Sequence, residues 1–102
     1  MEKVRQILLE KLRGKNAFWS FENPAEIDDD MLIEKVFLML DIDDINILFQ
    51  IFDKELLRKV WEKRILSQEP YYHGLNRLFA WFYFDINNPD DFISKRKIYS
   101  IN

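Results

Sequence analysis

Apolar side chains recur at intervals of three and four residues along most of the 102-residue chain. This spacing is typical of amphipathic helices, because about 3.6 residues complete one helical turn. It predicts five helices, over residues 2–13, 30–40, 43–52, 54–66 and 70–84. A sixth, short helix is expected to begin at Pro89, followed by a tail. The predicted fold is therefore all-α, a compact bundle of five or six short helices.

The length of the chain and the absence of internal repeats predict a single helical domain over residues 1–102. Within it, residues 1–16 form an N-terminal helix, residues 17–84 the helical core, and residues 85–102 a short helix or tail. The side chains on the apolar stripes form the expected core, namely Ile7, Leu8, Trp19, Ile33, Val36, Phe37, Leu48, Phe52, Leu57, Trp61, Leu78, Phe79 and Phe82.

Polar residues and a glycine mark several of the predicted helix ends. Gly14 indicates the end of the first helix, since glycine tolerates the left-handed conformation there. Asp53 and Ser67 are expected to cap the helices over 54–66 and 70–84. Residues 79–84 are apolar on every side of their helix, so this helix is either buried all round or carries an exposed apolar patch.

Composition narrows the possible functions. The chain contains no cysteine, which excludes disulfides, thiolate metal sites and thiol catalysis. No segment approaches the roughly 20 consecutive apolar residues of a transmembrane helix. The charged N-terminus also lacks the apolar stretch of a signal peptide. We therefore expect a cytoplasmic protein that has no membrane partner.

No group of residues has the spacing of a catalytic or metal site. His73 is the single histidine, and no pattern of metal ligands surrounds it. Gly14 and Gly74 are isolated, so there is no glycine-rich loop that could cradle a phosphate. The aspartates at 28–30 and at 41–44 lack the spacing of an EF-hand loop. We expect no enzyme activity, no catalytic residues, no metal and no cofactor.

Charge is distributed unevenly along the chain. Residues 1–53 carry 6 basic and 12 acidic residues, a balance of −6, and residues 54–102 carry 9 and 6, a balance of +3. Residues 43–66 also resemble a helix-turn-helix in outline. The whole protein is acidic, which favours a solvated helix face over a DNA contact. Six cations are the candidate contacts to DNA or to a partner: Lys54, Arg58, Lys59, Lys63, Arg64 and Arg77.

A second candidate surface is polar and aromatic. Tyr71, Tyr72 and His73 lie near the predicted start of the helix over 70–84, and Trp81 lies further along it. Together they are a candidate patch for a protein partner. The simpler interpretation is a partly exposed helix start with Trp81 as a core anchor.

Several short motifs resemble a small family of uncharacterised helical proteins from Bacteroidetes-type bacteria. The similarity covers residues 18–84. Its motifs are Phe18-Trp19, Ile33-Glu34-Lys35-Val36, the break from Asp41 to Asp44 with Ile45 and Leu48, and Leu66-Ser67 leading to Asn76 and Phe79. Genes of this family are similar in size and setting to antitoxins beside nucleotidyltransferase-type abortive-infection toxins. The resemblance therefore implies a toxin as the protein partner.

Two functional hypotheses follow. The first is a small protein-interaction module, antitoxin-like as the resemblance implies, that acts by direct binding. The missing catalytic groups, the uneven charge and the many aromatic residues favour it. The alternative is a helix-turn-helix-like regulator that binds DNA through residues 43–66. Neither hypothesis specifies an oligomeric state.

Overall fold

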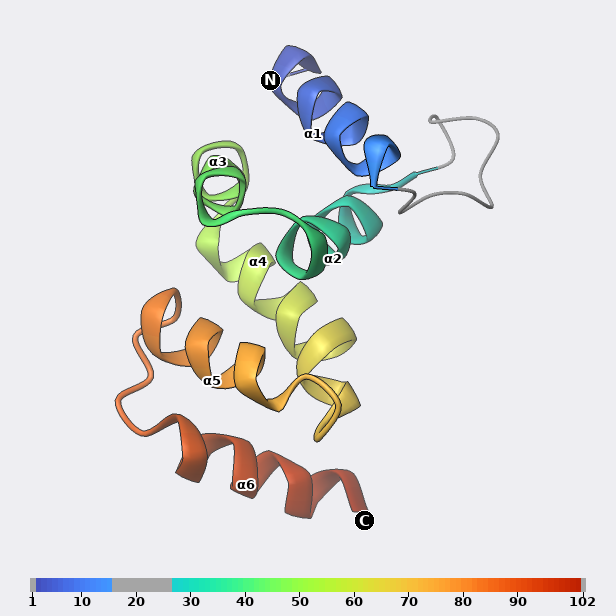
Figure 1. Ribbon diagram of the computed structural model, residues 1–102. Coiled ribbons are helices and arrows are strands. Elements are labelled where there is room, and N and C mark those ends of the chain that lie inside the picture. The colour runs from blue at the N-terminus through green and yellow to red at the C-terminus, as the bar shows by residue number, and fades with distance from the viewer. Residues whose placement is uncertain (1, 16–26, 102) are drawn as a thin grey trace. The chain divides into compact units, whose positions relative to one another are not determined.

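The computed structural model describes residues 2–15 and 27–101, with side chains up to Lys95. These residues form six α-helices and no β-strand, which confirms the all-α prediction (Figure 1). The helices are α1 (Glu2–Gly14), α2 (Asp29–Met39), α3 (Ile42–Ile51), α4 (Lys54–Val60), α5 (His73–Phe82) and α6 (Pro89–Ile101). Within this part of the chain, no helix is both long enough and apolar enough to cross a membrane.

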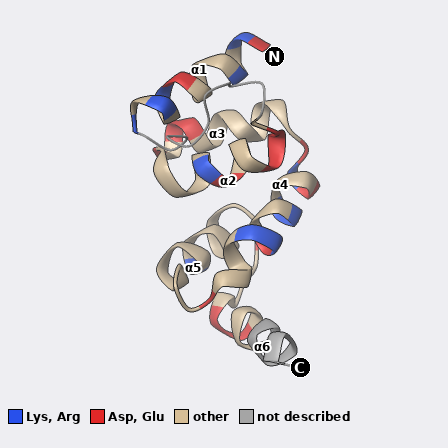
Figure 2. Ribbon diagram, turned by 90° about the vertical axis from the view of Figure 1, so that its right-hand side faces the viewer, with Lys and Arg blue, Asp and Glu red and all other residues tan. Residues whose placement is uncertain are grey.

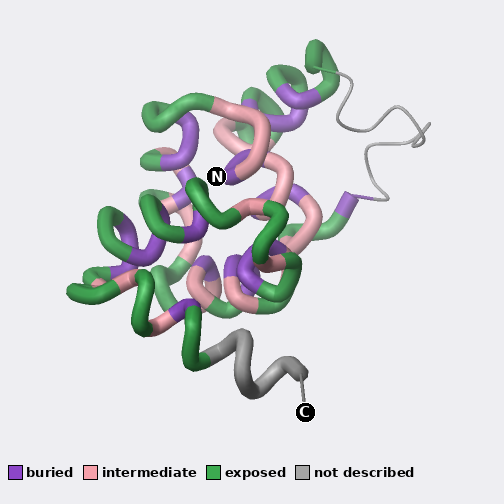
Figure 3. The backbone as a smooth tube through the Cα atoms, turned by 60° about the horizontal axis from the view of Figure 1, so that its bottom comes forward, coloured by how far each residue is buried: buried purple, intermediate pink, exposed green. Residues whose placement is uncertain are grey.

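The chain divides into two compact units, Met1–Val60 and Trp61–Asn102. The first unit contains α1 to α4, and the second contains α5 and α6. Along the helical turns, buried and exposed positions alternate, as they do in amphipathic helices (Figure 3). A single domain over residues 1–102 stays a prediction.

Helix α2 is the centre of the first unit, since α1, α3 and α4 all contact it. Its buried residues are Leu32, Ile33, Val36 and Phe37, which cover more than one side of the helix. Such a broad apolar surface predicts a central helix, and the structure confirms it. The same unit also buries Leu8, Leu12, Leu48 and Leu57.

Aspartates organise the start of α2. Asp28 is the N-cap, and its side chain accepts a hydrogen bond of 2.8 Å from the backbone N–H of Met31. Asp29 and Asp30 lie in the first turn, where negative charge suits the positive end of the helix dipole. The aspartates before this helix therefore have the local structural role that the sequence indicates.

Two charged side chains of α1 reach other parts of the first unit. Arg5 donates 3.2 Å and 2.8 Å hydrogen bonds to the Asp29 carboxylate and the Ile27 carbonyl. Lys11 donates a 2.6 Å hydrogen bond to Asp44, a buried carboxylate in the first turn of α3. This hydrogen bond and the negative charge of Asp44 raise the pKa of Lys11 above its ordinary value of 10.5.

The helix predicted over residues 54–66 changes its form part-way. After α4, residues Trp61–Ile65 form a π-helix, η2, and Leu66–Gln68 form a short 3-10 helix, η3. The expected cap at Ser67 is wrong, because the Ser67 hydroxyl donates back to the Lys63 carbonyl at 2.6 Å. The side chains of Ser67 and Gln68 donate hydrogen bonds to the backbone carbonyls of Lys63 and Arg64, four residues earlier.

The second unit is built around the indole of Trp61, which is fully buried. The ring of Phe84 stacks on it with a centroid distance of 4.9 Å, and that of Phe92 stacks at 6.2 Å. The stacked rings of Trp61, Phe84 and Phe92 join η2, the residues just after α5, and α6. Helix α6 begins at Pro89 as predicted, but it continues to Ile101, so the tail expected after a short helix is wrong.

The predicted core holds for eight of its thirteen residues, which are buried: Leu8, Ile33, Val36, Phe37, Leu48, Leu57, Trp61 and Phe79. Phe52 is only half-buried, and Trp19 lies outside the described residues. Ile7, Leu78 and Phe82 are exposed by 51%, 41% and 51%, so their assignment to the core is wrong. The reason is that each of these helices has more apolar residues than its buried face can take.

Replacing the buried indole tests the packing of the second unit. We expect Trp61→Ala to lower the free energy of unfolding by about 3–5 kcal/mol, because it removes a large ring and leaves a cavity. Urea denaturation followed by circular dichroism measures the change. A variant as stable as the wild type would contradict the placement of Trp61.

The raised pKa of Lys11 predicts the behaviour of the first unit at alkaline pH. The stabilisation from its charge is fully present below pH 10.5 and is lost as the pH rises through the higher pKa of the folded state. Lys11→Arg keeps the charge at high pH. In urea denaturation at neutral pH and at about pH 11, we expect this variant to lose less stability than the wild type. Equal losses would show that the ion pair does not contribute.

Candidate protein-interaction surface

Helix α5 carries two different faces. The inward face consists of Asn76, Phe79 and Ala80, and Tyr83 continues it just past the helix end. These residues are separated by three, one and three positions, so they lie on one side of the helix. Phe79 and Tyr83 contact each other with ring centroids 5.9 Å apart. Packing within the second unit therefore uses this side of α5.

The opposite side of α5 is apolar and exposed. Leu75 and Leu78 are 36% and 41% exposed, and Trp81 and Phe82 are 60% and 51% exposed. At 100° per residue these four positions span about 120° of the helix circumference. We call this set the α5 face. It is the exposed apolar patch that the sequence offered as one of two alternatives for residues 79–84.

The α5 face has almost no charge, and the ribbon of α5 is mostly uncharged in Figure 2. Arg77 is the only lysine, arginine or acidic residue in the helix, and its Nε donates to Asp90 at 2.8 Å. Its charge is therefore compensated within the second unit. Gly74 lies on the same side as Leu78 and Trp81, and a Cβ added there would meet no atom within 4 Å.

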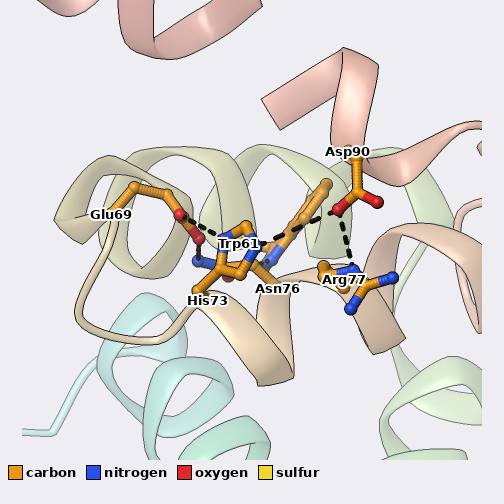
Figure 4. Close-up of polar contacts among 6 residues, drawn as sticks. All are labelled: Trp61, Glu69, His73, Asn76, Arg77 and Asp90. Atoms are coloured by element: carbon orange, nitrogen blue, oxygen red, sulfur yellow. Dashed lines mark hydrogen bonds and ion pairs between the residues drawn. The ribbon is translucent and has the colours of Figure 1, made fainter. Parts of the chain in front are cut away.

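A chain of polar contacts fixes the rotation of α5 (Figure 4). The buried Trp61 indole N–H donates to the Asn76 carbonyl oxygen at 2.9 Å, and the Asn76 amide donates to Glu69 at 2.6 Å. The other oxygen of Glu69 lies 2.7 Å from Nδ1 of His73. Asn76, on the inward face of α5, is thus hydrogen-bonded to the buried Trp61 and to Glu69 in the preceding loop.

The same chain of contacts reaches the surface at α6. Nε2 of His73 lies 4.0 Å from the Asp90 carboxylate, which also binds Arg77. Glu69 has a partner on each carboxylate oxygen, His73 on one and Asn76 on the other, and its side chain is only 8% exposed. These contacts give the group a structural role, because they hold the loop over residues 69–72 and the starts of α5 and α6 in place.

The structure separates the four residues of the predicted polar-aromatic patch. Trp81 lies on the α5 face, whereas His73 belongs to the polar chain around Glu69. Tyr71 is 79% exposed in the turn before α5 and packs edge-on against half-buried Tyr72 at 4.7 Å. The prediction that Trp81 anchors the core is wrong. Leu75 was missed as a surface residue, although two apolar stripes on one helix are visible in the sequence.

The six candidate cations do not belong to one unit. Lys54, Arg58 and Lys59 lie in α4 of the first unit, Lys63 and Arg64 lie in η2 of the second, and Arg77 lies in α5. Only two residues separate α3 from α4, whereas the turn of a helix-turn-helix has roughly three or four. DNA contact by these residues stays a prediction.

Two other kinds of site can be assessed among the described residues. Among the described residues, no three His, Asp or Glu side chains converge as a metal-binding group. A hollow of about 130 Å³ in the first unit is lined by Glu2, Arg5, Asp29, Ile51 and Phe52. Its arginine is already bound to Asp29. The α5 face is therefore the stronger candidate.

The buried amide of Asn76 allows a test of how α5 is held. Asn76→Asp places a second carboxylate against Glu69, and like charges at this distance repel. We expect a loss of about 1–3 kcal/mol in unfolding free energy at neutral pH. The loss should shrink below about pH 4, where carboxylates become protonated. Asn87→Asp, the same change at an exposed position, is the control and should show neither effect.

Comparison with known proteins adds no relative, because no family, no curated protein and no solved structure matches the chain. The resemblance to the antitoxin-like family stays a hypothesis.

Proposed function

We propose that this protein is an interaction module that binds another protein chain directly through the α5 face. The observation that carries the proposal is the exposure of Trp81 and Phe82, at 60% and 51%, beside two exposed leucines on one helix. Contiguous exposed apolar patches on a folded protein are often binding sites, whereas apolar residues exposed singly are common and need no functional explanation.

The chemistry of the α5 face suits the centre of a protein interface. Such centres are depleted in charge and enriched in aromatic residues, and tryptophan is among the residues whose truncation costs most binding energy. Two hydrogen bonds also hold α5 in its orientation, because Asn76 on the other side of the helix is bonded to both Trp61 and Glu69. A surface that is already ordered loses little conformational entropy on binding.

An antitoxin-like role is one specific form of this function. It would require a toxin with an apolar surface complementary to Leu78, Trp81 and Phe82. The support for a toxin is the family resemblance, whereas the support for direct protein binding is the α5 face. The two parts of the proposal can therefore fail separately.

Affinity capture tests the proposal. The tagged full-length protein is incubated with lysate of its native cells beside Leu78→Glu and Trp81→Glu variants. A matched control is Ile42→Glu, which changes a residue that is 53% exposed in α3 of the first unit. We expect the wild type and the control to enrich the same protein, and each α5 variant to reduce its recovery at least about tenfold, as for interface hot spots.

Circular dichroism and thermal melting of all variants verify folding, because substitutions at exposed positions change stability little. Equal enrichment by the wild type and both α5 variants would contradict binding through the α5 face. Enrichment that is lost only in Ile42→Glu would move the interaction to the first unit.

A further inference from the structure

We propose that His73 is a pH-sensitive switch within the second unit: its charged ring links the loop before α5 to the start of α6, and its neutral ring does not. The two ring nitrogens face carboxylates on different elements (Figure 4). Nδ1 lies 2.7 Å from Glu69 in the loop, and Nε2 lies 4.0 Å from Asp90 in the first turn of α6. The ring can donate to both carboxylates only when it is charged, because only then do both nitrogens carry a proton.

Loss of the proton weakens both contacts. A neutral ring keeps one N–H, and when this N–H is on Nδ1, Nε2 presents a lone pair to the Asp90 carboxylate. Glu69 then loses a positive charge, since its other partner, the Asn76 amide, is uncharged. The Glu69 side chain is nearly buried, and a carboxylate in such a site is destabilising when its charge is not compensated.

Charged side chains approach the ring from three elements. Glu69 comes from the loop, Asp90 from α6, and Arg77 from α5 itself. Arg77 donates to the same Asp90 oxygen that faces His73, so this carboxylate keeps a partner in both charge states of the ring. Helices α5 and α6 also pack against each other. A rise in pH is therefore expected to weaken the link to α6 without separating the two helices.

The position of His73 suits a group that responds to pH. Its side chain is 48% exposed, so the ring can exchange protons with solvent, whereas Glu69 beneath it is nearly buried. Histidine is the residue type whose charge changes between about pH 5 and 8. His73 is the single histidine in the chain. A change in stability that requires this imidazole can therefore be assigned to one group.

Urea denaturation of the full-length protein at about pH 5.5 and about pH 8 tests the inference, with circular dichroism as the signal. The wild type is compared with His73→Gln, whose amide cannot become charged. Between the two pH values, we expect the unfolding equilibrium constant of the wild type to rise about fivefold more than that of His73→Gln, because the charged ring stabilises the folded state only at the lower pH. Glu69→Gln keeps the imidazole but removes the carboxylate at Nδ1, and it should show the smaller pH dependence of His73→Gln.

Two substitutions in the first turn of α6 form a matched pair. Asp90→Asn removes the carboxylate that faces Nε2, and we expect it to reduce the pH dependence part-way, since this contact is long and exposed to solvent. Asp91→Asn removes a neighbouring carboxylate that pairs with Lys95 at 3.0 Å. This control should keep the pH dependence of the wild type.

Each part of the switch can fail separately. Equal pH dependence of the wild type and His73→Gln overturns the switch. Full pH dependence in Glu69→Gln overturns the contact with the loop, and equal behaviour of Asp90→Asn and Asp91→Asn overturns the link to α6. None of the substituted residues lies on the α5 face, so these results leave the proposed function to its own test.

Discussion

The hydrogen bond between the buried indole of Trp61 and the side chain of Asn76 controls the arrangement of the second unit. An indole N–H without a partner in the core would be costly, and Asn76 satisfies it from the inward face of α5. The amide group of Asn76 then binds Glu69, which also contacts His73. The rotation of α5 about its axis is thereby set by a few directional contacts rather than by apolar packing alone.

This constraint explains why α5 exposes large apolar residues. Apolar burial is not directional, so by itself it would favour turning either stripe of α5 inward. The stripe that contains Asn76 and Phe79 faces the core, because the polar contacts can form only in that orientation. Leu78, Trp81 and Phe82 are then left outside. An exposed aromatic surface on a helix whose orientation is fixed by hydrogen bonds is a property that a binding protein can use.

The first unit follows a simpler plan. Helix α2 is apolar over much of its circumference, and α1, α3 and α4 contact it. Charged residues join elements of this unit, as Lys11 does with the buried Asp44 of α3. The two units therefore differ in what organises each of them internally: apolar packing around α2 in the first, and polar contacts around Trp61 and Asn76 in the second.

The sequence by itself determined that the described chain is helical and roughly where most helices begin and end, because apolar periodicity and capping residues act locally. Residues 28–30 and Pro89, for example, mark the starts of α2 and α6, and this effect depends only on neighbouring residues in the chain. The sequence could not decide which stripe of α5 is buried, since both are apolar. That choice depends on Trp61 and Glu69, which are 15 and 7 residues from Asn76 along the chain. Only the tertiary structure brings these groups together, and with them the exposed surface of α5.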